Sequence, residues 1–377
     1  MSKDSRIQPM QQPRTLPVRP IIGASALAMI AGVIAIEGGT LYDLTGTVST
    51  VSGAVARKQF SGVIALGPVE DGLPDGWALL APIDLQCIKA SGVTFALSAI
   101  ERVIEERARG DASAAAAIRA QLEDKVGSGI RSVIPGSAGA MQLKAALIEE
   151  GMWSQYLEVA IGPDAEIFSK SPVLSAVGTG AQIGVRSDSH WNNPEPEIVL
   201  VCDAHGEVVG ATLGNDVNLR DFEGRSALLL SKAKDNTASC AIGPFIRLFD
   251  EGFTIDDVRG ADVELTIEGP EGYLLEGRND MSQISRDPLD LVAQCLSEHH
   301  YPDGFVLFCG TLFAPTQDRD TPGAGFTHKV GDVVTIRSQK LGTLRNTVTT
   351  SRDAPAWTTG FAAFAKNLAT RGLIDRI

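Results

Sequence analysis

The chain has 377 residues, of which 44% are hydrophobic and 21% are charged, and its formal net charge at pH 7 is −13. This length allows more than one domain, and the negative charge argues against a nucleic-acid partner because it repels phosphate backbones. The five cysteines are scattered and never form a C-x-x-C pair, which argues against a disulfide framework or zinc site and favours the reducing cytoplasm.

Residues 1–20 are expected to form a flexible tail. The apolar run at residues 21–36 follows Arg14 and Arg19, and in this respect it is similar to a signal peptide. The run is short for a membrane span, and it continues as a strand, a Gly-Gly turn and a second strand. We therefore expect core strands and no membrane association, with a signal peptide as the alternative.

The next part of the chain changes from strand patterns to helix patterns. Residues 21–110 are expected to be β-rich, with "GGTLYDLTG" and "WALLAPIDL" as typical strand segments between turn signals. Helices are expected at residues 95–109, 111–125 and 138–150, because their apolar residues recur at helical spacing. Residues 111–155 are thus predicted to be a helical connection.

Residues 156–377 are predicted to be the catalytic domain. Strands are expected at "EIVLVC", "EVVGATL", "VELTIEG" and "GDVVTI". A helix is expected at "SRDPLDLVAQCL", with Asp287 as N-cap and Pro288 in the first turn, and a second helix at residues 359–373. Since strands and helices do not alternate as βαβ units, a doubly wound sheet is not expected. The predicted fold is mixed α+β and mostly β.

Two glutamates, Glu195 and Glu197, each follow a proline and lead into an apolar strand. Side chains two apart in a strand share one face. A turn near residues 202–208 would place residue 214 opposite Glu195 and Asp216 about 7 Å further along the sheet. Three converging carboxylates repel each other unless a cation lies among them, and oxygen ligands suit Mg²⁺ or Ca²⁺. The alternative is three exposed surface acids.

The residues around these acids carry a family resemblance. The resemblance is carried by residues 194–224, "PEPEIVLVCDAHGEVVGATLGNDVNLRDFEG", and by the following "AKDNTASCAIGPFI". This part of the chain resembles the core of the fumarylacetoacetate hydrolase superfamily. The resemblance extends over about residues 79–348. It implies the β-roll of that superfamily, here with an N-terminal β-rich part and a helical insertion. It also implies a homodimer or higher homo-oligomer.

The resemblance also implies roles for single residues. Glu195, Glu197 and Asp216 match the ligands of a divalent metal ion, usually Mg²⁺, with Mn²⁺ as a possible substitute. Arg220 and Lys234 match polar residues of the active-site pocket. Thr311, in "CGTLFAP", matches a segment that lines the substrate side.

The reaction type depends on the start of the helix at residues 95–109. Hydrolases of the superfamily activate water with a histidine and a glutamate three residues later, and the matching positions here are Ser98 and Glu101. A serine hydroxyl is not a base near neutral pH without a base of its own. This difference argues against hydrolysis and leaves Ser98 as a substrate contact.

The segment "VRSDSHWNNPEPE" resembles the sugar-acid dehydratases of the superfamily, which act on 2-keto-3-deoxy-pentonates such as 2-keto-3-deoxy-D-xylonate. The expected reaction is a Mg²⁺-dependent dehydration that gives 2,5-dioxopentanoate in oxidative pentose breakdown, with a small sugar acid as the partner molecule. Two alternatives remain. One is a hydrolase or decarboxylase of an acylpyruvate-type substrate, and the other is a non-catalytic metabolite-binding protein.

The candidates for proton transfer and substrate binding complete the prediction. Lys234 could take the C3 proton if burial and a nearby Arg220 lower its pKa, or it could hold the substrate carboxylate as a cation. Glu101 is the alternative acid or base, although its helix is acidic in general. Three further residues could bind the sugar hydroxyls or could be ordinary turn formers; these are Ser187, Asp188 and Ser189.

Overall fold

The fold is taken from a computed structural model. It describes residues 15–16, 18–19, 32–61, 64–68, 70, 77–115, 118, 133–313, 315, 317–322 and 325–377. Within this part of the chain, no helix combines the length and the apolar character needed to cross a bilayer.

The larger of two facing sheets runs through most of the molecule. Its strand order is β5-β4-β3-β1-β13-β11-β10-β16-β6-β7, and β2 pairs with β3. The strands are β1 (Thr15–Leu16), β2 (Val18–Arg19), β3 (Gly32–Glu37), β4 (Thr40–Asp43), β5 (Ile64–Pro68), β6 (Cys87–Gly92), β7 (Glu166–Ser171), β10 (Pro196–Cys202), β11 (Val208–Asp216), β13 (Cys240–Leu248) and β16 (Phe305–Phe308).

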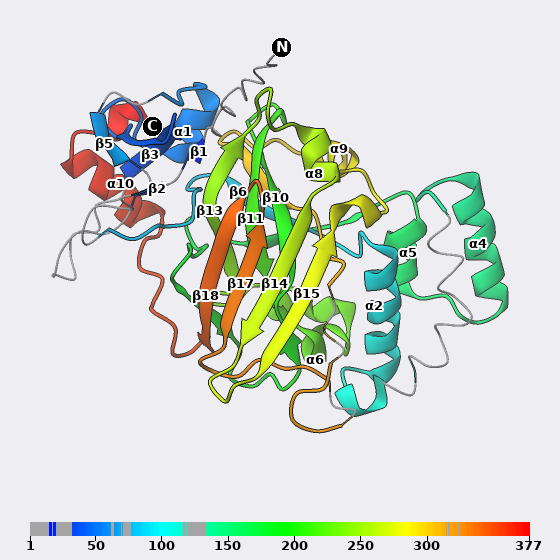
Figure 1. Cartoon of the computed structure of the whole chain (residues 1–377). Coiled ribbons are helices and arrows are strands. Elements are labelled where there is room, and N and C mark those ends of the chain that lie inside the picture. Colours follow the sequence, from blue (N-terminus) through cyan, green and yellow to red (C-terminus); the bar gives the residue numbers. More distant parts are fainter. Residues whose placement is uncertain are drawn as a thin grey trace, which may run out of the picture.

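A smaller sheet packs across one face of the larger one (Figure 1). Its strands are β8 (Gln182–Val185), β14 (Asp262–Glu268), β15 (Leu274–Asp280), β17 (Val333–Ser338) and β18 (Gly342–Thr350), in the order β15-β14-β17-β18-β8. Two short strands pair separately; these are β9 (Asn192–Asn193) and β12 (Asn218–Leu219).

Short helices connect the strands or cap the sheets. The α-helices are α1 (Val51–Ala56), α2 (Ala96–Ala108), α4 (Ala138–Glu149), α5 (Gln155–Ile161), α6 (Arg220–Glu223), α7 (Leu230–Lys234), α8 (Ile255–Arg259), α9 (Pro288–Leu296) and α10 (Phe361–Thr370). Single 3-10 turns are η2 (Ala227–Leu229), η3 (Met281–Gln283) and η4 (Ile374–Arg376). The predicted mixed fold, mostly β with the β-roll architecture, is thereby confirmed.

The central strand β10 explains why "EIVLVC" has no polar alternation. Ile198 and Leu200 belong to the apolar core between the two sheets, whereas Val199 and Val201 belong to a second apolar cluster on the opposite face. A strand buried on both faces reads as a continuous apolar run. β10 therefore forms the middle of the fold, and residues at its start have a rigid support.

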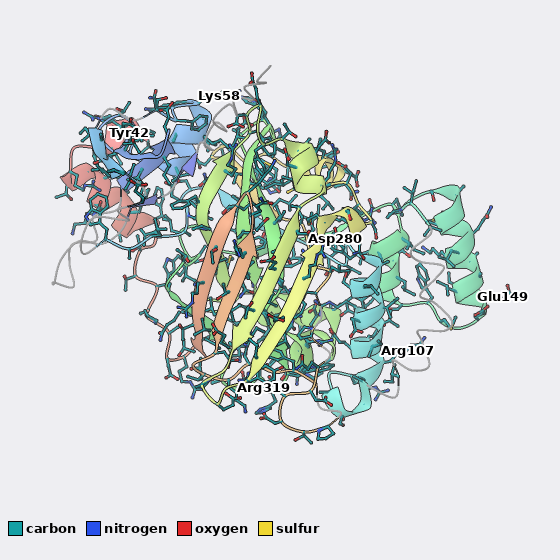
Figure 2. The ribbon with its side chains drawn as sticks, in the orientation of Figure 1. Tyr42, Lys58, Arg107, Glu149, Asp280 and Arg319 are labelled. Carbon is teal, nitrogen blue, oxygen red and sulfur yellow. The ribbon has the colours of Figure 1, made fainter. Side chains whose placement is uncertain are left out.

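The helices α2, α4 and α5 form a satellite layer beside the sheets (Figure 1). Ile100, Val103 and Ile104 lie on one face of α2 and pack in this layer's core. Figure 2 shows Arg107 of α2 and Glu149 of α4 at the outer side of the layer. Of the predicted helices, those at residues 95–109 and 138–150 are confirmed. Residues 112–115 are helical, and most of the predicted helix at 111–125 lies outside the described residues.

Two predictions for the N-terminal part need correction. Within the predicted tail, residues 15–16 form β1, which pairs with β13 and β3, so these two residues belong to the large sheet; residues 1–14 lie outside the described residues. Residues 77–85, "WALLAPIDL", form no strand, because Asp84 turns back to accept backbone N–H groups of Val51 and Ser52. Of the apolar run at residues 21–36, only residues 32–36 are described, and they lie in β3.

The final segment of the chain returns to this N-terminal part (Figure 1). Ser49 binds it twice, since its N–H donates to the Arg376 carbonyl at 3.1 Å and its hydroxyl to the Leu373 carbonyl at 3.1 Å. The helix α9 has Asp287 as N-cap and Pro288 at its first position, as predicted. All five cysteines are free thiols.

Candidate metal and proton-transfer site

The candidate site lies where β10 begins and β11 ends. Pro196 pairs with Asn215 and Glu197 with Gly214, so Glu195 comes opposite Asp216. The Asp216 N–H donates to the Glu195 carbonyl at 3.0 Å. The predicted register, with residue 214 opposite Glu195, is wrong by two residues. The bulge at Val201/Cys202 accounts for one of them, and the turn accounts for the other, because Cys202 pairs with Val208 and not with residue 207. The shift brings the third carboxylate directly beside the first two.

The three carboxylates are buried. Glu195, Glu197 and Asp216 are 4%, 1% and 1% exposed, and each offers one oxygen within 4.8 Å of the others. The alternative of three exposed surface acids is therefore wrong. Pro196 is the first residue of β10, which fits the restriction of proline to strand starts or edge strands. β10 itself is a central strand of the large sheet.

Glu197 is held by the backbone of the opposite wall. Its Oε2 accepts the N–H of Gly310 at 2.6 Å. Gly310 has φ +89°, and a Cβ there would lie 2.0 Å from Thr94 Oγ1, so only glycine fits this close approach. Burial raises the pKa of Glu197 well above its ordinary value, and the charges of Asp216 and Glu195 raise it further.

Two lysines contact the cluster. The Nζ of Lys234 binds Glu195 Oε2 and lies 2.9 Å from Asp216 Oδ2, and the Nζ of Lys170 lies 2.7 Å from Asp216 Oδ1. Burial acts to lower the pKa of Lys234, but the carboxylates of Asp216 and Glu195 outweigh it and raise the pKa above its ordinary value. Without a metal ion, the two carboxylates therefore favour the ammonium form of Lys234, and its role as a base stays a prediction.

A chain of buried ion pairs leads from the cluster into α2. Arg102 contacts Glu195 at 2.5 Å, and both Glu105 and Glu223 at 2.7 Å. Glu105 in turn accepts from Arg220 Nε at 2.6 Å. Although burial opposes its ionisation, the two arginines lower the pKa of Glu105. The helix α2 is thus tied electrostatically to the first of the three carboxylates.

Arg220 and Glu101 lie at the far end of this chain. Arg220 pairs with Glu101 at 3.1 Å and Glu105, donates to the Pro315 carbonyl, and stacks its guanidinium 4.5 Å from the Trp191 ring centre. Neither side chain lines the carboxylate cavity. Both were predicted to be catalytic; in this arrangement they lie one ion pair behind Arg102, and their catalytic role stays a prediction.

Glu166 is a further acid of the cavity that the sequence analysis did not identify. It lines the same cavity as the three carboxylates, and a Cβ on Gly92 would lie 2.1 Å from its Oε2, so the two segments meet closely. Burial, followed by the charge of Glu223, raises the pKa of Glu166 to about 7. A carboxyl group of this kind can exchange protons near neutral pH.

The enclosed space is small. Its volume is about 20 Å³, which is enough for one ion or water molecule but not for a substrate. Five carboxyl groups face it against two cations, Arg102 and Lys234. The five are Glu166, Glu195, Glu197, Asp216 and Glu223. This donor set, all oxygen and rich in negative charge, fits a divalent cation such as Mg²⁺.

The predicted substrate-side residues divide into two groups. Thr311 and Ser98 line the carboxylate cavity, as expected. The Ser98 hydroxyl donates to the Phe95 carbonyl and accepts the Phe95 N–H, so it caps α2. Ser187 and Asp188 line a different cavity, and the Ser189 hydroxyl binds Asp221 at 2.9 Å. The structure does not bring these three residues to the carboxylates.

A period-2 pattern could have identified part of what was missed. Glu166, Phe168 and Lys170 alternate along β7 and therefore share one face. Two charged residues on one face of a strand in an apolar sheet are unusual unless they serve a site. Arg102 and Glu223 carried no such signal, because their neighbours in the sequence are charged as well.

Comparison with known proteins identifies a matching family and two curated relatives of this chain. The family described as fumarylacetoacetate (FAA) hydrolase, C-terminal, matches residues 152–349. A "Probable 2-keto-3-deoxyxylonate dehydratase" of Haloferax volcanii is 33% identical over 202 residues, which are 54% of this chain and 66% of that protein. A 2-dehydro-3-deoxy-D-arabinonate dehydratase of Saccharolobus solfataricus is 34% identical over 179 residues, or 48% and 57% of the two chains. The match thus spans less than two thirds of each curated relative.

A solved structure supports the fold over a longer range. The 2-keto-3-deoxy-D-arabinonate dehydratase complexed with magnesium and 2,5-dioxopentanoate is similar with a TM-score of 0.62 at 22% identity. The superposition covers 89% of this chain and 99% of that structure. At this identity the likeness establishes the fold alone.

Proposed function

Because this chain belongs to the fumarylacetoacetate hydrolase family, we propose that it is a Mg²⁺-dependent dehydratase of a 2-keto-3-deoxy-pentonate. The observation that carries the proposal is the buried cluster of Glu195, Glu197 and Asp216. The two curated relatives bear the names of dehydratases for such sugar acids, and this supports the substrate class.

The reaction removes the C3 proton and the C4 hydroxyl of the substrate as one water molecule. The remaining enone then tautomerises to 2,5-dioxopentanoate. An ion held by Glu195, Glu197 and Asp216 would polarise the 2-keto group and so acidify the C3 protons. Mg²⁺ suits the oxygen donors, and Mn²⁺ is accepted by the same ligands.

Glu166 supplies the proton transfer. It faces the cavity and makes no ion pair within the described part of the chain, and its pKa of about 7 lets it take the C3 proton and return it to the departing hydroxyl. Lys234 is the cation that binds the negative charge of the substrate. This assignment replaces the predicted base, since Lys234 is held as an ammonium by Asp216 and Glu195.

Ser98 supports dehydration over hydrolysis. Its hydroxyl is engaged in the cap of α2 and takes the place of the histidine that would activate water in a hydrolase. Dehydration needs no nucleophilic water, because water is the leaving group. The absence of a histidine at this position is therefore compatible with a lyase.

The setting of the reaction is part of the same proposal. Free thiols fit the reducing cytoplasm, and the substrate fits an oxidative route of pentose breakdown. By family resemblance we expect a homodimer or a higher homo-oligomer, which light scattering would measure.

The test is an assay with purified full-length protein and Mg²⁺. We expect a 2-keto-3-deoxy-pentonate to be converted to an aldehyde that a coupled semialdehyde dehydrogenase oxidises, with little cleavage of acylpyruvates. Glu197→Gln should lower the activity by on the order of 100-fold or more, because a neutral amide is a poor ligand for Mg²⁺. The thermal midpoint of this variant, measured without metal, should not fall, because the substitution removes a buried carboxylate that Asp216 and Glu195 repel.

The matched control is Glu276→Gln, which changes an exposed glutamate on β15. It should retain full activity. Full activity of Glu197→Gln in the presence of a chelator, or preferential acylpyruvate cleavage by the unmodified protein, would overturn the proposal.

A further inference from the structure

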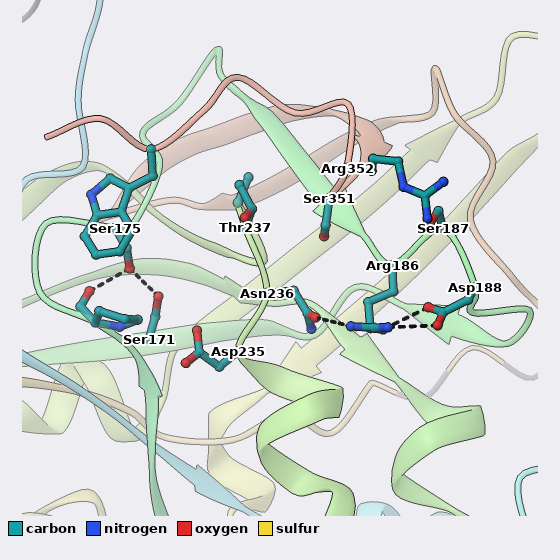
Figure 3. Close-up of a pocket in the computed structure, with 13 residues that line it drawn as sticks. Ser171, Ser175, Arg186, Ser187, Asp188, Asp235, Asn236, Thr237, Ser351 and Arg352 are labelled. Carbon is teal, nitrogen blue, oxygen red and sulfur yellow. Dashed lines mark hydrogen bonds and ion pairs between the residues drawn. The ribbon is translucent and has the colours of Figure 1, made fainter. Parts of the chain in front are cut away.

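A second cavity of about 490 Å³ lies outside the carboxylate site (Figure 3). Its walls come from the ends of β7, β8 and β18 and from the loop after α7. The two cavities share no lining residue. The volume lies within the range of small-molecule sites, roughly 300–1,000 Å³.

The two cavities lie back to back on the same chain segments. Lys170 and Lys234 direct their ammonium groups to Asp216, whereas the residues that follow them, Ser171 and Asp235, line the second cavity. Lys170 also donates to the Lys234 carbonyl, which joins the two segments. The segments around Lys170 and Lys234 thus contribute to both cavities, and a hydrogen bond joins them.

One arginine of this cavity is available to a ligand. Arg186 is already engaged, because it binds Asp188 through two hydrogen bonds of 2.9 and 2.8 Å and Asn236 at 3.3 Å. Arg352 is exposed, and among the residues that the structure describes it has no hydrogen bond or ion pair. Figure 3 shows Arg352 next to Ser187 at one end of the cavity. A guanidinium fork matches the two oxygens of a carboxylate.

The remaining polar lining consists of hydroxyl groups. Ser171 and Ser175 bind each other at the opposite end from Arg352 (Figure 3). Ser351 Oγ is enclosed and has no hydrogen-bond partner within the described chain. Thr237 and Ser187 add two more hydroxyls. Such a lining can donate to and accept from a chain of hydroxyl groups.

The apolar element is Trp357. Its indole N–H donates to the Thr359 carbonyl at 3.0 Å, which orients the ring, and 47% of the residue remains exposed. An aromatic face of this kind covers the C–H face of a carbohydrate-like ligand. The acids Asp188 and Asp235 on the same walls disfavour a dianion such as phosphate.

From these features we propose that the second cavity is a binding site for a small hydroxylated carboxylate. Its carboxylate binds Arg352, its hydroxyls bind the serine and threonine side chains, and its carbon chain lies against Trp357. The inference does not rest on the proposed reaction, because the site uses none of the residues of the carboxylate cavity.

The test is calorimetric titration of the full chain with D-xylonate, a five-carbon sugar acid without the 2-keto group. The protein carries Glu197→Gln and the buffer contains a chelator, so that binding at the metal site is removed. We expect saturable binding that Arg352→Ala weakens by at least about tenfold. The matched control is Arg337→Ala, an exposed arginine of β17 outside the cavity, which should leave the affinity unchanged.

Two comparison ligands identify the ligand class, and Trp357→Phe gives a second variant. Propionate, which has no hydroxyl groups, and inorganic phosphate should both bind at least about tenfold more weakly than D-xylonate. Trp357→Phe keeps an aromatic face and should retain binding. Absence of saturable D-xylonate binding, equal affinity of the two arginine variants, or equal affinity for propionate or phosphate would each overturn the proposal.

Discussion

At the scale of single residues, the environment of each carboxyl group separates its role from that of its neighbours. Asp216 contacts two lysines, and although burial opposes ionisation, their charges lower its pKa. Glu166 makes no ion pair within the described part of the chain, and burial together with the charge of Glu223 outweighs Arg102 and Lys234 and raises its pKa to about 7. Carboxyl groups whose surroundings push their pKa values apart are suited to different tasks. We propose that Asp216 binds a metal ion and that Glu166 carries a proton.

The prediction for Glu166 follows from this difference. Glu166→Gln should lower kcat by roughly 10²–10⁴-fold, because an amide cannot accept the C3 proton. KM should change little, since the metal ligands and Lys234 are untouched. Steady-state kinetics with a 2-keto-3-deoxy-pentonate would measure both constants, with Glu276→Gln as the control. A variant with unchanged kcat would remove Glu166 from the proton-transfer step.

At the scale of elements, the helix α2 has two structural roles. Ile100, Val103 and Ile104 anchor it in the helical layer. Arg102 and Glu105 extend the chain of ion pairs from Glu195 into the helix. Because the space of about 20 Å³ is too small for a substrate, we expect lining side chains to move on binding, and α2 carries two of them, Ser98 and Arg102.

Arg102→Ala should therefore destabilise the protein strongly. The substitution leaves Glu105, Glu195 and Glu223 buried without their shared cation, and loss of one partner of a buried pair costs about 3–5 kcal/mol. The free energy of unfolding from urea titrations would measure this. Arg107→Ala, on the exposed side of the same helix (Figure 2), should cost under about 0.5 kcal/mol. Equal losses in the two variants would contradict the buried-network interpretation.

The elements also show what the sequence could predict and what it could not. The strand at "EIVLVC" and the helix α9 were predictable, because continuous apolar runs and the Asp-Pro start are local signals. The register of β10 with β11 was not, since neither the bulge at Val201/Cys202 nor the length of the turn after Cys202 has a local signature. Likewise, "WALLAPIDL" alternates like a strand, but Asp84 prefers to cap α1.

The same distinction holds for the site. Glu195, Glu197 and Asp216 were predictable because motif and strand periodicity agree. Glu166 lies on β7, and its place beside the cluster depends on the pairing of β7 with β6. Ser187 and Asp188 come shortly before Glu195 in the sequence, but they face the second cavity because β8 belongs to the smaller sheet. Contacts across sheets are not encoded in sequence neighbours.

At the scale of the whole molecule, a buried polar cluster under the smaller sheet links stability to pH. Asp332 binds Arg319 at 2.6 Å and His328 at 3.1 Å. Burial lowers the pKa of His328 below its ordinary value of 6.5. Burial opposes the ionisation of Asp332, but the hydrogen bonds from Arg319 and His328 lower its pKa from 3.8 to about 2.

Both shifts make the folded protein less stable in acid. As the pH falls, His328 binds its proton in the unfolded chain at a higher pH than in the folded protein. The folded state therefore loses stability as the pH falls from 6.5 through the lower pKa that His328 has in the folded protein. The contribution of Asp332 is lost later, as the pH falls from 3.8 towards 2. Urea titrations between pH 7 and pH 3 should show this decline.

A single variant isolates the histidine. His328→Asn should flatten the decline below pH 6.5 by at most about 1.4 kcal/mol per pH unit, which is the limit for one proton. His205→Asn, at an exposed turn, should leave the slope unchanged. If the free energy of unfolding falls with pH equally steeply in His328→Asn and in the unmodified protein, another group causes the loss of stability in acid.

The order of strands in the large sheet also has a consequence for synthesis on the ribosome. The strand β10 lies between β11 and β16, and β16 in turn pairs in parallel with β6, joining Phe305 to Cys87. The hairpin of β10 and β11 can form early, but one edge of β10 stays open until residues 305–308 have left the exit tunnel. An open, apolar edge strand invites pairing with other chains, and such distant closures fold slowly. Nascent chains of this protein are therefore expected to depend on holding chaperones until β16 closes the sheet.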